Sequence, residues 1–79
     1  MNDRFKNVLA DVFGLKESDI HFQLIKTDVA NWDSLKQMDL VMTLEREYSI
    51  SLEIPDIIKM ISVESIIEVL LDKGVELGD

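Results

Sequence analysis

The chain has 79 residues, 47% of them hydrophobic and 30% charged, which allows one globular domain with a marginal core. Its 16 acidic and eight basic residues give a net charge of −8, which argues against nucleic acid as a partner. The acidity favours basic protein surfaces or simply maintains solubility. Without cysteine, a membrane-length apolar run or an apolar signal core, we expect a cytoplasmic protein that lacks disulfides and thiolate chemistry of its own.

Residues 2–13 are expected to form the first helix, capped by Asn2 or Asp3 and ended by Gly14. Apolar residues recur there at the spacing of one helix face. They are Phe5, Val8, Leu9, Val12 and Phe13.

Residues 15–31 are expected to form a long ordered loop, with at most a short turn opened by Ser18 and Asp19. Apolar and polar residues alternate at 20–24 and again at 50–54, which by period alone indicates two short strands. Two isolated strands make a marginal ribbon, so we expect these apolar side chains to fill gaps between helices. His21 is the only histidine, and Trp32 is expected to wedge the loop against the bundle.

The second helix is expected over residues 34–48, with Asp33 as its N-cap and Ser34 at its first position. At about 100° per residue from Ser34, one apolar face is centred near about 290° and a second stripe near about 75°. The first comprises Leu40, Val41, Leu44 and Tyr48, and the second Leu35, Met38 and Met42. Since a bundle helix needs one apolar stripe for the core, the second is free for another use.

The rest of the chain predicts a short helix over 55–60 that Pro55 begins, and a last helix over 63–73 that Ser62 caps and Gly74 ends. Residues 75–79 are expected to form a frayed acidic tail. The predicted fold class is therefore all-α, a small bundle of three main helices and one short helix in a single domain over residues 1–79.

Catalytic chemistry finds no support in the residue pattern. The acidic residues are scattered over helix surfaces, and a calcium loop and a glycine-rich phosphate cradle are both absent. We therefore predict no catalytic residue, no metal site and no enzymatic activity; the chain is better interpreted as a substrate on which other enzymes act.

The start of the second helix resembles the acyl carrier proteins, whose attachment signature Asp-Ser-Leu is matched by Asp33-Ser34-Leu35. Residues 38–48 continue the acidic, apolar pattern of that helix, and Ile61-Ser62-Val63 resembles the start of the family's last helix. The resemblance covers essentially the whole chain and implies the bundle described above, including its long first loop.

The resemblance implies that a phosphopantetheinyl transferase attaches 4'-phosphopantetheine from coenzyme A to Ser34, with Asp33 and Leu35 completing the signature. The arm would carry acyl groups as thioesters to acyl-transferring and acyl-modifying enzymes with basic docking patches. Residues for docking these partners would be Leu35, Met38, Asp39, Met42 and Glu45. Residues for lining an acyl chain would be Leu44, Leu52, Ile57, Met60 and Ile66. The carrier is expected to be a monomer.

Two features depart from the fatty-acid carriers: Lys36 replaces the usual acidic residue, and Trp32 precedes the aspartate. They favour a dedicated specialised pathway over general fatty acid biosynthesis. Both pathways are kept as alternatives, and a role in lipid metabolism is expected. An aminoacyl or peptidyl carrier is an alternative, but the Gly-Gly common before its serine motif is missing. Another alternative is an unmodified helical adaptor that binds a partner through Leu35, Met38 and Met42.

Overall fold

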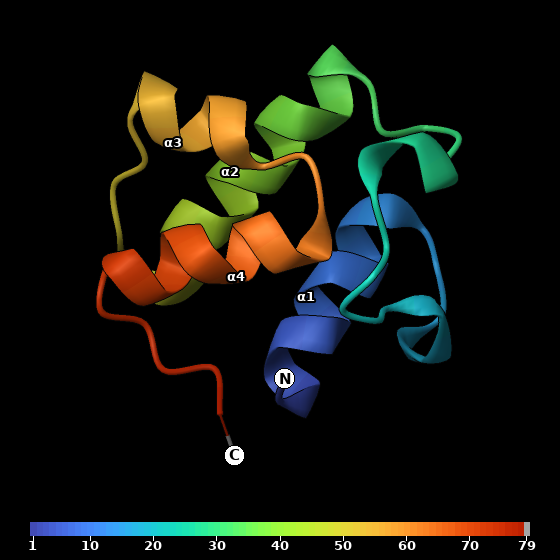
Figure 1. Cartoon of the computed structure of the whole chain (residues 1–79), viewed down its shortest axis with the longest axis horizontal. Helices are drawn as coiled ribbons and strands as arrows, with labels where there is room; N and C mark the ends of the chain where they lie inside the picture. Colours follow the sequence, from blue (N-terminus) through green and yellow to red (C-terminus); the bar gives the residue numbers. More distant parts are fainter. Residues whose placement is uncertain (79) are drawn as a thin grey trace.

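The computed structural model describes residues 1–78 and contains four α-helices and two short 3-10 helices (Figure 1). In chain order they are α1 (Asp3–Phe13), η1 (Glu17–Asp19), η2 (Lys26–Asp28), α2 (Ser34–Tyr48), α3 (Ile54–Lys59) and α4 (Val63–Asp72). Over these residues there is no strand, only an isolated antiparallel bridge between Ile25 and Ser62. The predicted all-α class is confirmed.

Side-chain caps begin the three longer helices. The Asn2 side chain accepts a hydrogen bond from the Phe5 backbone N–H, and Ser62 accepts one from the backbone N–H of Ser65. Asp33 caps α2 in the same way, as described below. Each cap satisfies an N–H that the helix itself leaves without a partner. The short α3 begins one residue before the expected Pro55, with Glu53 preceding it.

Helix ends differ in how they reach the left-handed backbone conformation. Gly14 ends α1 with φ of 67°, as its lack of a side chain allows. Ser49 ends α2 with φ of 54°, although it is not glycine. At this end Arg4 of α1 pairs with Glu47 at 3.0 Å and lies 4.7 Å from the centre of the Tyr48 ring. These contacts join the start of α1 to the end of α2.

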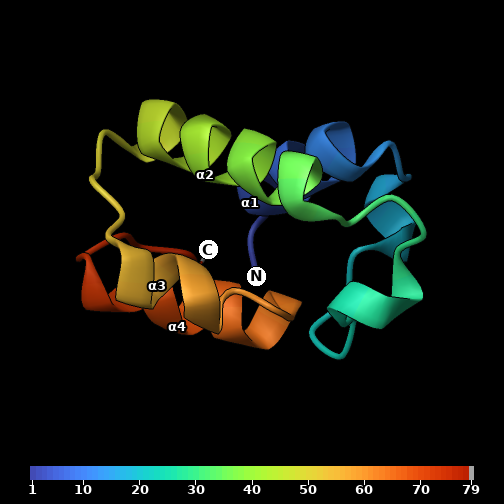
Figure 2. The ribbon, with the colours of Figure 1, turned by 90° about the horizontal axis from the view of Figure 1, so that it is seen from above.

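The helices surround one core. Figure 2 shows α1 and α2 on one side and α3 and α4 on the other, with the loop that carries η1 and η2 closing one end. Fully buried core side chains include Phe5 and Leu9 of α1, Leu40 and Leu44 of α2, and Leu70 of α4. The aliphatic and aromatic area removed from water is the main favourable term for folding such a chain.

The long loop contributes to this core, as the sequence predicts. Ile20, Leu24 and Val29 are buried, and the buried Trp32 ring lies 4.5 Å from the Phe13 ring, centroid to centroid. The wedge role predicted for Trp32 is thus confirmed. Phe22 and, in the second alternating run, Ile54 are exceptions: their side chains are 50% and 72% exposed, so they do not fill gaps between helices.

The prediction of a frayed C-terminal tail is wrong for Leu77, whose side chain is only 4% exposed. Its backbone carbonyl accepts a hydrogen bond of 3.0 Å from the Asn2 backbone N–H, which ties the tail to the start of α1. An acidic composition suggests fraying, but one apolar side chain packed into the core is enough to order the segment. Asp79, the last residue of the predicted tail, lies outside the described residues.

Candidate functional site

The start of α2 presents an exposed hydroxyl. Asp33 has an extended backbone, and its Oδ1 accepts a hydrogen bond of 2.9 Å from the Lys36 backbone N–H. Ser34 follows as the first helical residue and is exposed, and Leu35 beside it is 84% exposed. A hydroxyl here can be reached by a modifying enzyme. A phosphodiester formed on it would be stabilised by about 0.3–1 kcal/mol in the field of the helix N-terminus.

A buried hydrogen-bond network holds this helix start in place. The Trp32 indole N–H donates to Gln37 Oε1 at 2.6 Å, and these two residues flank the Asp33-Ser34-Leu35 segment in the chain. The Gln37 amide nitrogen donates to the backbone carbonyls of Ile57 and Met60, each at 3.0 Å. Gln37 therefore connects the loop before α2 with the end of α3, and it fixes the backbone on which Ser34 sits.

Sequence reasoning missed Gln37, although a signal was present. At about 100° per residue, Gln37 falls at about 300°, inside the apolar face that points to the core. A lone amide on such a face must find partners, because an unpaired buried polar group costs about 1–3 kcal/mol. The nearby Trp32, whose N–H also needs a partner, was the available hint.

The second apolar stripe is on the surface, as its angle predicts. Leu35, Met38 and Met42 are 84%, 49% and 60% exposed, and we call them the α2 stripe. The exposed Asp39 lies beside it, with its carboxylate 3.8 Å from the ammonium of Lys36. An apolar strip next to a charged residue is a surface that another protein can cover.

Glu45, the other acid predicted for docking, is engaged within the chain. Its Oε2 accepts a hydrogen bond of 2.8 Å from the Leu52 backbone N–H, in the segment between α2 and α3. The side chain is half-buried and stabilises that segment. Its carboxylate is therefore less available to a partner than that of Asp39.

The residues predicted to line an acyl chain come together in the core. Leu44, Met60 and Ile66 are fully buried, and Leu52 and Ile57 are half-buried against the same cluster. Surface hollows of about 450 and 230 Å³ lie elsewhere in residues 1–78, and neither is lined by any of these five side chains. In this conformation the five predicted lining residues are therefore part of the packed core or lie against it.

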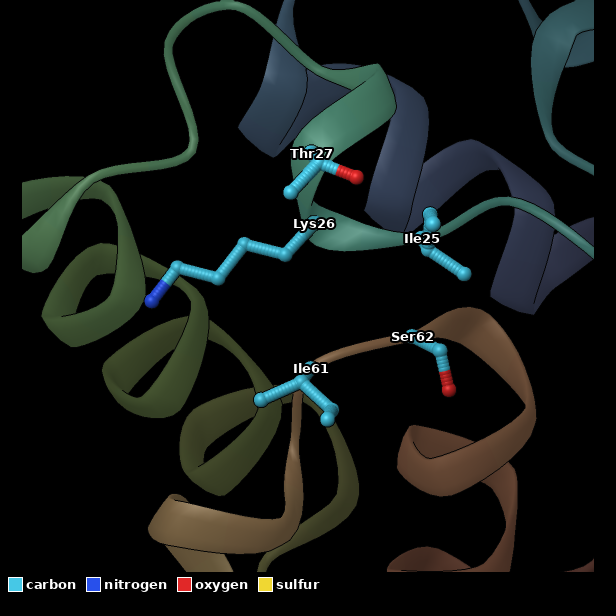
Figure 3. A pocket seen from close by; sticks show the side chains of 5 residues that line it. All are labelled: Ile25, Lys26, Thr27, Ile61 and Ser62. Atoms are coloured by element: carbon cyan, nitrogen blue, oxygen red, sulfur yellow. The ribbon is translucent and has the colours of Figure 1, made fainter.

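The larger hollow lies between η2 and the segment that joins α3 to α4 (Figure 3). The smaller one is lined mainly by apolar residues of the loop, α4 and the two ends of the described chain. No group of three or more potential ligands within residues 1–78 is arranged to hold a metal ion. None of the helices in this part of the chain combines the length and the apolar character needed to cross a bilayer.

The exposed serine at the capped start of α2 lies on the surface of a small acidic bundle, where a modifying enzyme can reach it. The chain matches the family described as "Phosphopantetheine attachment site" over residues 3–70 and so belongs to it. The acyl carrier protein of Petrotoga mobilis is 27% identical over 71 residues, which cover 90% of this chain and 84% of the relative.

This membership confirms the family resemblance seen in the sequence. The prosthetic group of the family is 4'-phosphopantetheine, covalently attached, and its members carry this group rather than catalyse a reaction.

Proposed function

We propose that this protein is an acyl carrier whose 4'-phosphopantetheine is attached to Ser34. The observation that carries the proposal is the exposed Ser34 at the first position of α2, directly after the Asp33 cap. Family membership and the name of the Petrotoga mobilis relative support it. The other serines lack this combination: Ser62 and Ser65, for example, bond to each other at the start of α4.

The residues present fit such a group. Attachment forms a bond from the Ser34 oxygen to phosphorus and breaks the pyrophosphate P–O bond of coenzyme A, with release of adenosine 3',5'-bisphosphate and of the serine proton. The resulting phosphodiester is anionic and lies at the positive end of α2. When attached, the group supplies the terminal thiol that this cysteine-free chain lacks, on which an acyl group is held as a thioester.

We further propose that the α2 stripe and Asp39 dock the phosphopantetheinyl transferase and the enzymes that load and modify the acyl group. Methionine adapts its shape to different contacts, which suits a surface that meets several partners in turn. Basic patches on those enzymes would complement the net charge of −8. The pathway is fatty-acid-like or a dedicated biosynthetic route, and Lys36 and Trp32 favour the second.

The test is intact-mass measurement after incubation with coenzyme A and a transferase of broad specificity. The wild-type chain should gain the mass of one phosphopantetheine group, and Ser34→Ala should stay at its starting mass with an unchanged circular dichroism spectrum. Ser51→Ala, which removes another exposed serine, is the matched control and should be modified like the wild type. A wild-type chain that gains no mass would favour the unmodified adaptor, and a modified Ser34→Ala would disprove the assignment of the serine.

A further inference from the structure

The larger hollow combines apolar walls with one cation. Its lining consists of Ile25, Lys26, Thr27, Ile61 and Ser62, and its volume is about 450 Å³. Ile25 and Ile61 are 45% and 56% exposed, so their aliphatic surface faces the hollow and the solvent rather than the core. In Figure 3 the Lys26 side chain extends from η2 towards α2, above Ile61.

Backbone hydrogen bonds hold the two walls together. The Lys26 N–H donates to the Ile61 carbonyl at 2.8 Å, and the Val63 N–H donates to the Leu24 carbonyl at 2.9 Å. The isolated bridge between Ile25 and Ser62 belongs to the same contact. The hollow is thus built by two segments fixed against each other, and a ligand would find it already formed, which lowers the cost of binding.

The hollow lies at the same end of the molecule as Ser34. The segment from η2 to α2 folds back on itself, since the Trp32 N–H donates to the Val29 carbonyl at 3.1 Å. Figure 2 shows η2 and the start of α2 together at the end of the bundle that the long loop closes. A flexible arm on Ser34 would therefore start from the end of the bundle at which the hollow lies.

Lys26 forms no ion pair with a carboxylate within residues 1–78. The ion pairs within residues 1–78 are Arg4–Glu47, Lys36–Asp39 and Lys73–Asp56. The half-buried Lys26 side chain is in none of them, although acidic residues outnumber basic ones two to one in the chain. The hydroxyl of Ser62 is already engaged, because it accepts from the Ser65 N–H at 3.0 Å. The polar groups left for a ligand are the Lys26 ammonium and the exposed Thr27 hydroxyl.

We propose that this hollow binds the acyl group carried by the protein, and that Lys26 selects acyl chains with a carboxylate at the far end. Methylene groups would lie against Ile25 and Ile61, while the carboxylate pairs with the ammonium. This inference rests on the proposed function and names its substrate class, a dicarboxylic acid held through one end. The phosphodiester on Ser34 is also an anion that could pair with the Lys26 ammonium. The experiment below distinguishes it from the carboxylate of the acyl group.

The test compares adipoyl and hexanoyl groups, which have equal carbon number and differ in the terminal carboxylate. Both are loaded with the transferase from the corresponding coenzyme A thioesters, and loading is verified by intact mass. Backbone amide shifts are then recorded by NMR for apo, unacylated, hexanoyl and adipoyl forms. The pKa of the adipoyl carboxyl is measured from its 13C shift. Lys26→Gln is the test variant, and Lys16→Gln, which removes an exposed lysine of the same loop, is the matched control.

We expect the adipoyl form to shift the amides of residues 25–27 and 61–63 more than the hexanoyl form does. The carboxyl pKa should be lower in the wild type and in Lys16→Gln than in Lys26→Gln, by about 0.5 pH unit, with the difference shrinking in added salt. Equal shifts for adipoyl and hexanoyl would overturn the selection of a carboxylate. A Lys26-dependent shift that is complete in the unacylated form would assign the anion to the phosphodiester and also overturn it. If no form gains mass, the proposed function itself fails, an outcome distinct from loading without selection.

Discussion

Trp32 and Gln37 form a hydrogen bond of 2.6 Å that encloses the start of α2, with the indole N–H as donor and the amide oxygen as acceptor. Through its amide nitrogen the same Gln37 donates to two carbonyls at the end of α3. The loop, α2 and α3 are therefore coupled by one buried side chain. Ser34 lies in the chain between the two residues of the first bond, although Gln37 is not part of the Asp-Ser-Leu signature.

Replacing this amide should destabilise the fold. Gln37→Met keeps a similar volume and a good helix former, but it removes the acceptor of the Trp32 N–H and the side-chain donor of the Ile57 and Met60 carbonyls. We expect a loss of about 2–4 kcal/mol in the free energy of unfolding, measured by urea denaturation. Gln23→Met, at an exposed position in the loop, is the control and should change stability by less than about 0.5 kcal/mol. Equal melts for the two variants would contradict the structural role of Gln37.

The ion pair between α3 and α4 should make stability depend on pH. The Asp56 carboxylate accepts from the Glu53 backbone N–H at 3.0 Å and from the Lys73 ammonium at 2.9 Å. The backbone hydrogen bond first, and then Lys73, hold the pKa of Asp56 below its ordinary value, while the hydrogen bond to Asp56 raises the pKa of Lys73. The contribution of Asp56 is therefore complete above about pH 4 and is lost as the pH falls through its folded-state pKa. That of Lys73 is complete below about pH 10 and is lost as the pH rises through its own.

We accordingly expect Asp56→Asn to lower the melting temperature at pH 7. Its difference from the wild type should shrink as the pH falls towards the folded-state pKa of Asp56, where the carboxylate becomes protonated, and shrink again at alkaline pH, where Lys73 loses its charge. Asp11→Asn, an exposed change on α1, should show no comparable pattern. Thermal melts followed by circular dichroism, at intervals of about one pH unit between pH 3 and pH 11, measure this difference in melting temperature. A difference that persists unchanged at the lowest pH would mean that the carboxylate charge is not its cause.

The parts of the fold that the sequence could predict are those that local interactions determine. Asn2, Asp33 and Ser62 cap helices with hydrogen bonds to residues only three positions away, so their spacing is visible in the chain. The two faces of α2 follow from helix periodicity alone, and so does the exposure of the α2 stripe. The position of Ser34 at the helix start was predictable for the same reason.

Features that depend on distant partners were not predictable. Leu77 is ordered by a contact with Asn2 at the other end of the chain, and the hollow beside Lys26 exists because Ile61 lies across from η2. Glu45 has the sequence pattern of a surface acid, yet its carboxylate accepts a hydrogen bond from the Leu52 backbone N–H. In each case the residue type permits several roles, and a partner that is remote in the sequence decides among them.

Truncation of neighbouring α2 residues should separate core from surface. Leu44 is fully buried, so Leu44→Ala removes packed methyl groups and should cost about 2–5 kcal/mol in urea denaturation. Met42 is exposed, so Met42→Ala should change stability by less than about 1 kcal/mol, and yet slow loading by the transferase because the α2 stripe loses its central side chain. If Met42→Ala destabilises the protein as much as Leu44→Ala does, the stripe is core rather than a docking surface.

The charge beside the α2 stripe gives the last prediction. Asp39→Lys should slow modification by a transferase with a basic docking patch, chiefly through the association rate, because like charges then face each other. Glu68→Lys on α4 is the matched control: each change moves the net charge from −8 to −6, but only Asp39 adjoins the stripe.

Glu45 is avoided, since its replacement would also remove the partner of the Leu52 N–H. Asp39 is already close to Lys36, and exposed ion pairs are weak, so the expected slowing at low salt is at most about fivefold. Stopped-flow loading kinetics over a range of salt concentrations measure it, and added salt should bring Asp39→Lys towards the wild-type rate. Equal slowing by Glu68→Lys would show that only the total charge matters, and a defect of Asp39→Lys that salt leaves unchanged would show that Asp39 acts by a direct contact instead.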